Sequence, residues 1–232
     1  MNVYLMRHGE TDWNKQGLMQ GSADIPLNAY GRELAQVTAE GLCEDGVRFD
    51  CIFSSPYIRA LQTAAIIAER TLIAKATETH SPLQMISRES GVIVDSRIRE
   101  MSFGKYEGIR IAELRTNEDY IEINKCFDDP IHYVSEPPAE SYDQVFNRVC
   151  SFLKKEIFPL QDTCENVLVV CHGAVIRAFI SVIKRLMLSQ YWTIHQPNCS
   201  ICIARVSDKE ISMIEENRLY YEPHTDAGRR FV

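Results

Sequence analysis

The chain has 232 residues, of which 45% are hydrophobic and 25% charged, and its formal net charge is −7 at pH 7. This length suits one α/β domain over residues 1–232, and the composition is ordinary for a globular protein. The acidic balance argues against non-specific nucleic-acid binding, which needs basic surfaces, and no apolar run is long enough to span a bilayer.

The chain begins with an apolar run, Met1 to Met6, that predicts a short strand. This strand delivers Arg7, His8 and Gly9 at its end. An arginine beside a histidine, followed by a glycine that lets the backbone approach a ligand closely, suits an oxyanion such as phosphate. Taken alone, the same residues fit a surface Arg-His pair at a strand end equally well.

The next segments alternate between loop, helix and strand. Residues 14–23 contain Gly17, Gly21 and Ser22 and predict a loop. From residue 28 or 29 to about 44, apolar residues at helical spacing predict an amphipathic helix. Residues 51–54 predict a second strand.

A second helix is expected to follow that strand, with Ser55 as N-cap and Pro56 at the first helical position. It should run over residues 57–70 and bury a stripe through Ile58, Leu61, Ala65 and Ala68. Arg59 stands in its first turn, where a guanidinium and free backbone N–H groups could converge on one anion. An arginine on a solvated helix face is the alternative.

The middle of the chain is less regular. Residues 71–90 predict helix or loop, residues 91–95 a strand, and residues 99–108 an irregular glycine-rich segment. Helical character resumes over residues 109–117. The loosely patterned residues 120–138 are expected to complete a cap, about 109–139, over a crevice.

The last third contains a second strand that ends in His-Gly. Ser141 and Gln144 form a capping-box pattern before a helix, and residues 166–171 predict a strand that delivers His172 and Gly173. A helix over about residues 174–186 and strands over 200–206 and 210–215 should follow. Strands alternating with helices predict a three-layer α/β/α fold with a mainly parallel sheet, and the carboxyl ends of parallel strands face one crevice.

The eight cysteines do not indicate a disulfide framework. The chain starts in a strand without a signal-peptide pattern, so a cytoplasmic protein with reduced thiols is expected. Cys199 and Cys202 have zinc-like spacing, but no second pair completes a tetrahedral site, and the alternating pattern that continues to Val206 favours a strand.

Taken together, these motifs resemble the histidine phosphatase superfamily, the phosphoglycerate-mutase-like group. The likeness covers most of the chain in the family's order. It rests on Arg7-His8-Gly9-Glu10-Thr11, Asp24-Ile25-Pro26-Leu27 with Gly31, Ser54-Ser55-Pro56 with Arg59-Ala60-Leu61-Gln62-Thr63-Ala64, Glu100 with Phe103-Gly104 and Glu107-Gly108, and His172-Gly173.

The resemblance implies a role for each matching residue. His8 would be the nucleophile that forms a phosphohistidine, and Glu100 would be the general acid and base. Arg7, Arg59 and His172 would hold the phosphoryl oxygens, because fixed positive charge stabilises the phosphoryl-transfer transition state. The resemblance also implies substrate contacts from Asn14, which matches a family position near the phosphate, and from backbone donors around Gly21 and Gly173.

Two features depart from the family's pattern. The distance from Arg59 to Glu100 is long, so residues 71–90 are interpreted as an insertion. Ala139-Glu140-Ser141 replaces the Gly-Glu-Ser that many members have.

The segment from Glu100 to Gly108 favours the phosphatase branch over a phosphoglycerate mutase. Mutases usually carry extra cations in the following insertion, whereas Lys105, Arg110, Arg115 and Lys125 form no paired basic motif here. A non-catalytic sensor of phosphorylated ligands stays an alternative, since fold does not prove activity.

The expected ligand is a small phosphorylated substrate, with no nucleic-acid or membrane partner. The scheme requires no metal and no cofactor. Trp13, Phe103, Tyr106, Phe127 and Tyr133 are candidate walls of the pocket, each equally suited to packing. The sequence leaves the particular phosphomonoester and the oligomeric state open.

Overall fold

The side chains of the first strand, β1 (Asn2–Arg7), enter two different hydrophobic cores. In the computed structural model, which describes residues 1–73 and 91–222, Val3 and Leu5 face one core while Tyr4 and Met6 face the other. Successive side chains of a strand point to opposite faces, so a strand with an unbroken apolar run, here Val3 to Met6, must be covered on both sides. The sheet is therefore the middle layer of the molecule.

The described residues form one mixed six-stranded sheet with the order β3-β2-β4-β1-β5-β6. Strands β3, β2, β4 and β1 pair in parallel, and β5 is antiparallel to both β1 and β6. The strands after β1 are β2 (Cys51–Ser54), β3 (Ile93–Val94), β4 (Asn166–Cys171), β5 (Ile201–Ser207) and β6 (Glu210–Arg218).

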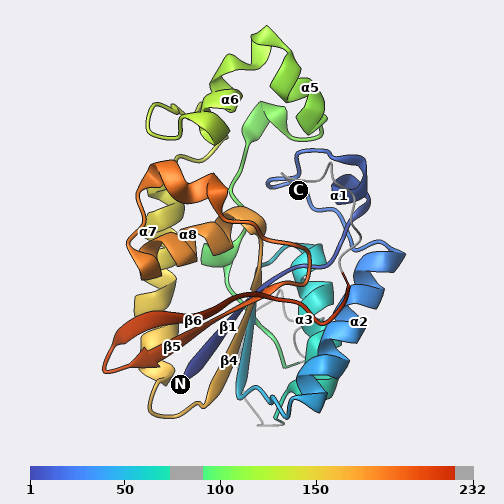
Figure 1. Cartoon of the computed structure of the whole chain (residues 1–232), viewed down its shortest axis with the longest axis vertical. Coiled ribbons are helices and arrows are strands. Elements are labelled where there is room, and N and C mark those ends of the chain that lie inside the picture. The colour runs from blue at the N-terminus through green and yellow to red at the C-terminus, as the bar shows by residue number, and fades with distance from the viewer. Residues whose placement is uncertain (74–90, 223–232) are drawn as a thin grey trace.

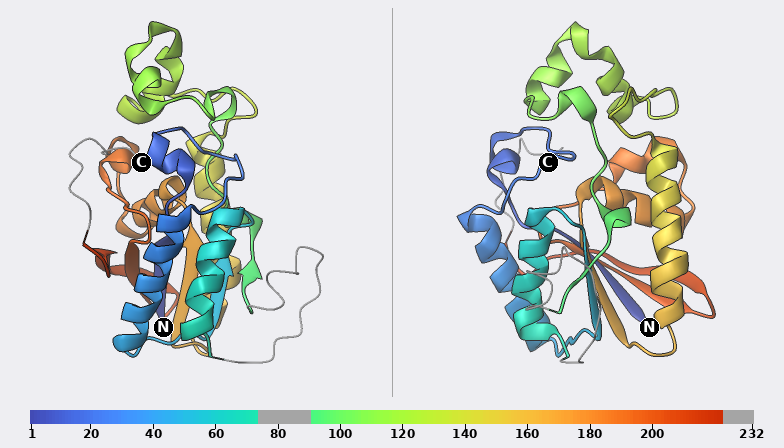
Figure 2. Two further views of the ribbon diagram at one scale, coloured as in Figure 1. Left: turned by 90° about the vertical axis from the view of Figure 1, so that its right-hand side faces the viewer. Right: turned by 180° about the vertical axis from the view of Figure 1, so that it is seen from behind.

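Helices cover both faces of this sheet (Figures 1 and 2). The α-helices are α1 (Asp12–Gln16), α2 (Ala29–Glu44), α3 (Ile58–Thr71), α5 (Ile111–Thr116), α6 (Ile121–Asp128), α7 (Tyr142–Phe152) and α8 (Gly173–Lys184). Helices α2 and α3 pack on one face, and α7 and α8 pack on the other. The predicted three-layer α/β/α fold with a mainly parallel sheet is confirmed.

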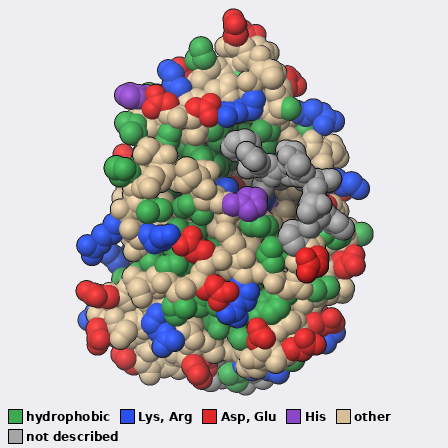
Figure 3. Space-filling view, viewed as in Figure 1, with side chains coloured by type: hydrophobic (Ala, Val, Ile, Leu, Met, Phe, Trp, Pro, Cys, Tyr) green, Lys and Arg blue, Asp and Glu red, His purple; other side chains and the backbone are tan. Residues whose placement is uncertain are grey.

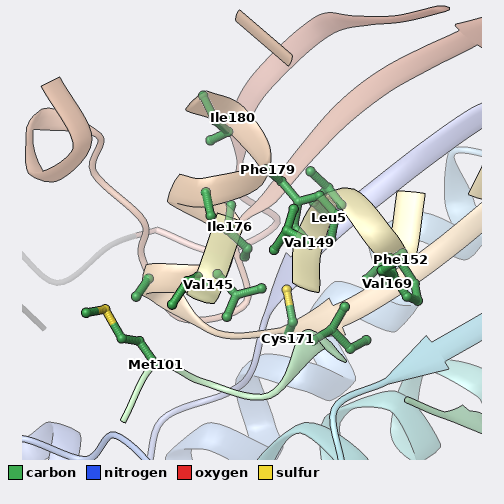
Figure 4. Close-up of a cluster of buried hydrophobic side chains, with 14 of the residues drawn as sticks. Leu5, Met101, Val145, Val149, Phe152, Val169, Cys171, Ile176, Phe179 and Ile180 are labelled. Atoms are coloured by element: carbon green, nitrogen blue, oxygen red, sulfur yellow. The ribbon is translucent and has the colours of Figure 1, made fainter. Parts of the chain in front are cut away.

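The core beneath α7 and α8 joins their apolar faces to β1 and β4 (Figure 4). Val149 and Phe152 of α7 and Phe179 of α8 meet Leu5 and Val169 of the sheet, and all five are buried. The predicted capping box fixes the start of α7, because Ser141 accepts from the backbone of Gln144 and Gln144 bonds back to the backbone of Ser141. This packing holds the two central strands in place, so their carboxyl ends are well defined.

The start of α3 differs from the prediction. The helix begins at Ile58 with Tyr57 as N-cap, and Tyr57 makes no side-chain cap bond. The carboxylate of Asp24 instead accepts a hydrogen bond from the backbone N–H of Ile58 at 2.6 Å. The prediction of Ser55 as the N-cap was wrong because a side chain from a distant loop supplies the acceptor.

The predicted buried stripe of α3 was right at Ala68, which is buried, and wrong at its other three positions. Ile58, Leu61 and Ala65 are only partly buried, whereas Arg59, Ala60, Thr63, Ala64 and Ile67 are among the residues that α3 buries. The helix is thus rotated relative to the prediction and turns its polar residues, Arg59 and Thr63, inward. A polar group is buried favourably only where it finds partners, and both residues have them.

The segment predicted as a loop over residues 14–23 is also partly helical. Asn14 lies inside the short helix α1, where Thr11 as N-cap and Asn14 form a reciprocal capping box. Gly17 then ends the helix in the left-handed conformation (φ +67°), which glycine adopts without strain.

Residues 109–139 form a projection at one end of the molecule, beyond the carboxyl ends of β1 and β4 (Figure 1). It contains helices α5 and α6, and the predicted helix over 109–117 is present in shorter form as α5. We call residues 109–139 the cap segment. The interpretation of residues 71–90 as an insertion falls mainly outside the described residues.

The surface seen in Figure 3 carries acidic and basic side chains interspersed with one another. In the described part of the chain, no helix has both the length and the apolar character needed to cross a membrane.

Two backbones approach so closely near His8 that a side chain would collide there. A Cβ on Gly31 would lie 2.0 Å from the carbonyl oxygen of Glu10, and a Cβ on Gly9 would lie 2.4 Å from the carbonyl oxygen of Gly31. We expect Gly31→Ala to lower the free energy of unfolding by about 3 kcal/mol, because rigid backbone must move apart. Urea unfolding would measure this change.

Gln36→Ala is the matched control, because Gln36 is exposed on the same helix. Its effect should stay within about 0.5 kcal/mol. Equal unfolding free energies for Gly31→Ala and the control would contradict the close approach.

Candidate active site

His8 lies directly after β1 and is almost fully buried. Its Nδ1 lies 2.7 Å from the carbonyl oxygen of Gly9, so Nδ1 carries the proton that this acceptor requires. The lone pair is therefore left on Nε2. Burial first, and the nearby charges of Arg59 and Arg7 next, hold the pKa of His8 well below its usual value, so the ring is neutral near pH 7.

The backbone next to His8 is held in place by side chains and backbone of α3. The N–H of Gly9 donates to the hydroxyl of Thr63 at 3.0 Å, which in turn donates to the carbonyl of Arg59. The first turns of α3 are thereby fixed to the end of β1. The polar residues of the Arg59 to Ala64 motif thus position the end of β1 and its histidine.

His172 lies at the end of β4, the parallel neighbour of β1, and is completely buried. Its ring centroid is 5.1 Å from that of His8. Its Nε2 lies 2.7 Å from the hydroxyl of Ser55, and its Nδ1 accepts from Nε of Arg59 at 3.3 Å. Burial and the charge of Arg59 lower its pKa well below 6.5, so this ring is also neutral.

Arg59 is fully buried in the first turn of α3. Its terminal nitrogens donate to the carbonyl oxygens of Ala23 at 2.6 Å and Gly21 at 2.8 Å. Backbone carbonyls and His172 therefore fix the plane of the guanidinium, and burial lowers its pKa. Gly21 contributes its carbonyl to Arg59, in the left-handed conformation (φ +51°), so it also positions the arginine.

Arg7 donates to the carbonyl of Gln196 at 2.5 Å and is 5% exposed. Burial, followed by the repulsion of Arg177, lowers its pKa to about 10, so it remains a cation near neutral pH. Two arginines and two neutral histidines thus meet in one place, which concentrates positive charge and hydrogen-bonding nitrogens there. Such a group stabilises a bound phosphoryl anion.

Glu100 faces this group from the segment after β3. One carboxyl oxygen accepts from the N–H of Met101 at 2.9 Å, and the other accepts from the N–H of Ala174 in the first turn of α8 at 3.3 Å. Glu100 is 8% exposed and lines the same pocket as His8. Its position suits proton exchange with a group bound there.

Asn14, Gly21 and Gly173 line the same pocket. The side-chain oxygen of Asn14 accepts from Thr11 as part of the capping box, which leaves the donor end of the amide for the pocket. Gly173 starts α8, where N–H groups lack intrahelical partners. A Cβ on Gly173 would lie 3.0 Å from Arg177, so its lack of a side chain keeps the pocket open.

The structure therefore brings all eight predicted residues together at the carboxyl ends of β1 and β4. The pocket has a volume of about 510 Å³, counted out to its open mouth. Of the predicted walls, only Phe103 lines it; Trp13, Tyr106, Phe127 and Tyr133 do not.

Sequence reasoning missed several residues of this pocket. Trp192, Gln20 and Arg177 line it, and the side-chain oxygen of Gln20 is buried without a hydrogen-bond partner in the described structure. Arg177 had a detectable signal, because it is a lone cation within the apolar first turns of α8. The sequence pattern predicts Ser55 as a helix cap, whereas in the structure its hydroxyl is the hydrogen-bond partner of His172.

Among residues 1–73 and 91–222, no cluster of three or more His, Cys, Asp or Glu side chains could hold a metal ion. All eight cysteines are free thiols, and Cys202 lies in β5, as the strand prediction for residues 200–206 requires.

The two neutral histidines should make folding stability depend on pH. The unfolded chain takes up protons near pH 6.5, whereas the folded chain keeps both rings neutral to lower pH. The unfolded state then binds more protons below pH 6.5, so the free energy of unfolding should fall as the pH drops through that value. Each ring contributes about 1.4 kcal/mol per pH unit until its folded pKa is reached.

Urea unfolding of the wild type and of His8→Asn, from about pH 8 to about pH 5, would measure this dependence. The variant should lose about half of the histidine contribution. The same pH slope in both proteins would contradict the assignment of a buried neutral His8.

Comparison with known proteins places this site in a family context. The family model described as "Histidine phosphatase superfamily (branch 1)" matches residues 3–218. "Putative phosphoserine phosphatase 2" of Hydrogenobacter thermophilus is 28% identical over 217 residues, which cover 94% of this chain and 95% of that protein.

Two further proteins show the same likeness. "Probable phosphoglycerate mutase GpmB" of Proteus mirabilis is 31% identical over 201 residues, which cover 87% of this chain and 83% of that protein. The solved structure of YhfR from Bacillus stearothermophilus superposes with a TM-score of 0.77 at 26% identity, covering 94% of this chain and 98% of that one. Relatives with phosphatase names and with mutase names are thus both present.

Proposed function

Because the chain belongs to the histidine phosphatase superfamily, we propose that it is a phosphomonoester hydrolase that works without a metal, through a phosphohistidine intermediate on His8. The observation that carries this proposal is the hydrogen-bond distance from Nδ1 of His8 to the carbonyl of Gly9. It leaves Nε2 as a neutral nucleophile at the end of β1, beside two arginines. Neutral imidazole attacks phosphorus, whereas imidazolium has no lone pair to do so.

In the first step, Nε2 of His8 forms a bond to phosphorus while the ester P–O bond breaks. Glu100 gives its proton to the leaving alkoxide, and Arg7 and Arg59 balance the charge on the phosphoryl oxygens. His172 lies beside Arg59, and it binds a phosphoryl oxygen when its ring turns Nδ1 toward that oxygen. Nδ1 then carries the ring proton and donates it in a hydrogen bond. Ser55 permits either tautomer, because a hydroxyl both donates and accepts.

In the second step, water attacks the phosphohistidine and the N–P bond breaks. Glu100, now a carboxylate, takes a proton from the attacking water, and inorganic phosphate leaves. The product alcohol departs before this step in a phosphatase, whereas a mutase keeps it bound and returns the phosphoryl group to another hydroxyl.

The partners of four cations, Lys105 just before the cap segment and Arg110, Arg115 and Lys125 within it, support a phosphatase over a mutase. Lys105 pairs with Glu136, Lys125 with Glu122 and Arg115 with Asp128. Arg110 donates to the backbone carbonyl of Gln16. None of the four cations lines the pocket, so none is placed to retain a charged intermediate there.

The test is the hydrolysis of a panel of phosphomonoesters, including p-nitrophenyl phosphate and phosphoglycerates, with and without EDTA. Both released phosphate and isomerised product would be measured. We expect phosphate release that EDTA leaves intact. Isomerisation faster than release would identify a mutase, and phosphate binding without any turnover would identify a sensor.

A further inference from the structure

Arg177 is a third arginine in the pocket, and it has no role in the two catalytic steps proposed for His8 and Glu100. It lies one turn after Gly173 on α8, is 7% exposed, and lines the pocket together with Arg7 and Arg59. The residues around it on α8 are apolar, so no solvated helix face explains its presence. Burying a guanidinium is costly unless it is paired.

The guanidinium is held in a fixed position from one side. Its Nε donates to the carbonyl of Ile194 at 2.9 Å, and its central carbon lies 4.9 Å from the ring centre of Trp192. The indole N–H of Trp192 donates to the hydroxyl of Tyr142 at 2.7 Å, and that hydroxyl donates to the backbone carbonyl of Cys126 in the cap segment. This chain of contacts orients Arg177 before any ligand arrives.

The other side of the guanidinium faces the pocket. In the described residues, its two terminal nitrogens have no hydrogen-bond acceptor, and no carboxylate forms an ion pair with it. The guanidinium lies beside the phosphate-binding group. A Cβ on Gly173 would lie 3.0 Å from Nη1 of Arg177 and 3.7 Å from Nε of Arg7, so both arginines border the same point of the pocket. A planar fork of N–H donors is therefore available next to the bound phosphate.

The charge balance calls for a second anion. When Glu100 holds the proton that it gives to the leaving group, three guanidinium charges face a phosphate dianion, and one positive charge remains. We propose, on the basis of the phosphatase function above, that Arg177 binds a second anionic group of the substrate. The substrate is then a small phosphomonoester that carries a carboxylate or a second phosphate a few bonds from its ester oxygen.

Arg177→Met tests this assignment with esters matched in size. We would compare 3-phosphoglycerate and O-phosphoserine with glycerol 1-phosphate and phosphoethanolamine, which lack the carboxylate, and 1,3-propanediol bisphosphate would distinguish a second phosphate from a carboxylate. The variant should lower kcat/KM for esters with a second anion by about 10- to 100-fold more than for those without, chiefly through KM. Arg177→Lys should recover part of this loss, because it restores the charge but not the fork.

Two further variants separate binding from general structure. Arg110→Met removes an exposed arginine outside the pocket and should leave the ratio between the two ester classes unchanged. Tyr142→Phe removes the hydrogen bond to Trp192 and should lower the same ratio less than Arg177→Met does, because Tyr142 only positions the arginine.

Equal losses for both ester classes in Arg177→Met would overturn the proposal, as would a wild type that prefers esters without a second anion. Either result leaves the phosphatase function standing. A wild type that hydrolyses no ester in the panel would instead reject the phosphatase itself. Thermal unfolding of each variant would show whether a uniform loss reflects failure to fold.

Discussion

Replacing His8 with alanine should lower kcat for phosphomonoester hydrolysis by at least about 10⁴-fold, because the covalent route loses its nucleophile. The wild type should also retain a phosphoryl label when the reaction is stopped during turnover. The label should be lost in acid and kept in base, as an N–P bond requires. His8→Ala should retain none.

His132→Ala is the matched control. His132 lies on the cap segment, where its side chain is 72% exposed and pairs with Asp129. It takes no part in the pocket, so this variant should keep both turnover and label. Substantial label in His8→Ala, or an acid-stable label in the wild type, would reject His8 as the phosphorylated residue.

Replacing Arg59 with methionine should have the second largest effect, lowering kcat/KM by about 10³-fold. The same change should lower the free energy of unfolding by about 3 kcal/mol, because the carbonyls of Gly21 and Ala23 lose their donors inside the structure. Arg59 thus acts on catalysis and on folding together. Steady-state kinetics and urea unfolding of one preparation would measure both.

Arg48→Met is the matched control for the general effect of removing an arginine that donates to a backbone carbonyl. Arg48 also donates to a backbone carbonyl, that of Val47, but on an exposed surface. Its replacement should change the free energy of unfolding by less than about 0.5 kcal/mol and leave kinetics intact. If Arg59→Met kept its activity while losing stability, Arg59 would be a structural residue and not part of phosphate binding.

The sequence determined the layers of the fold and the location of the pocket. Apolar runs such as residues 166–171 have no polar side to expose, so they had to become central strands covered on both faces. Two such strands end in His-Gly, and parallel pairing brings their ends to one edge of the sheet. The strand pattern therefore predicts that His8 and His172 lie at one edge of the sheet, and the direct pairing of β1 with β4 in the structure brings their ring centroids to 5.1 Å.

Tertiary structure alone decided the contacts that depend on distant partners. Ser55 has the features of an N-cap, but Asp24 takes that role from another loop, and Ser55 is left to bond His172. The rotation of α3, which turns Arg59 inward, depends on the acceptors offered by Gly21 and Ala23. Local propensity contains no information on these partners, because they are contributed by loops whose paths the packing fixes.

The same distinction applies to Arg177. The sequence shows a lone arginine in an apolar helix, a pattern that fits a buried ion pair as well as a ligand site. Only the folded chain shows that Ile194 and Trp192 hold one side of the guanidinium while the other side faces the phosphate-binding group. Strand and helix patterns are local and can be read from neighbouring residues, whereas the direction of a buried charge depends on every element packed around it.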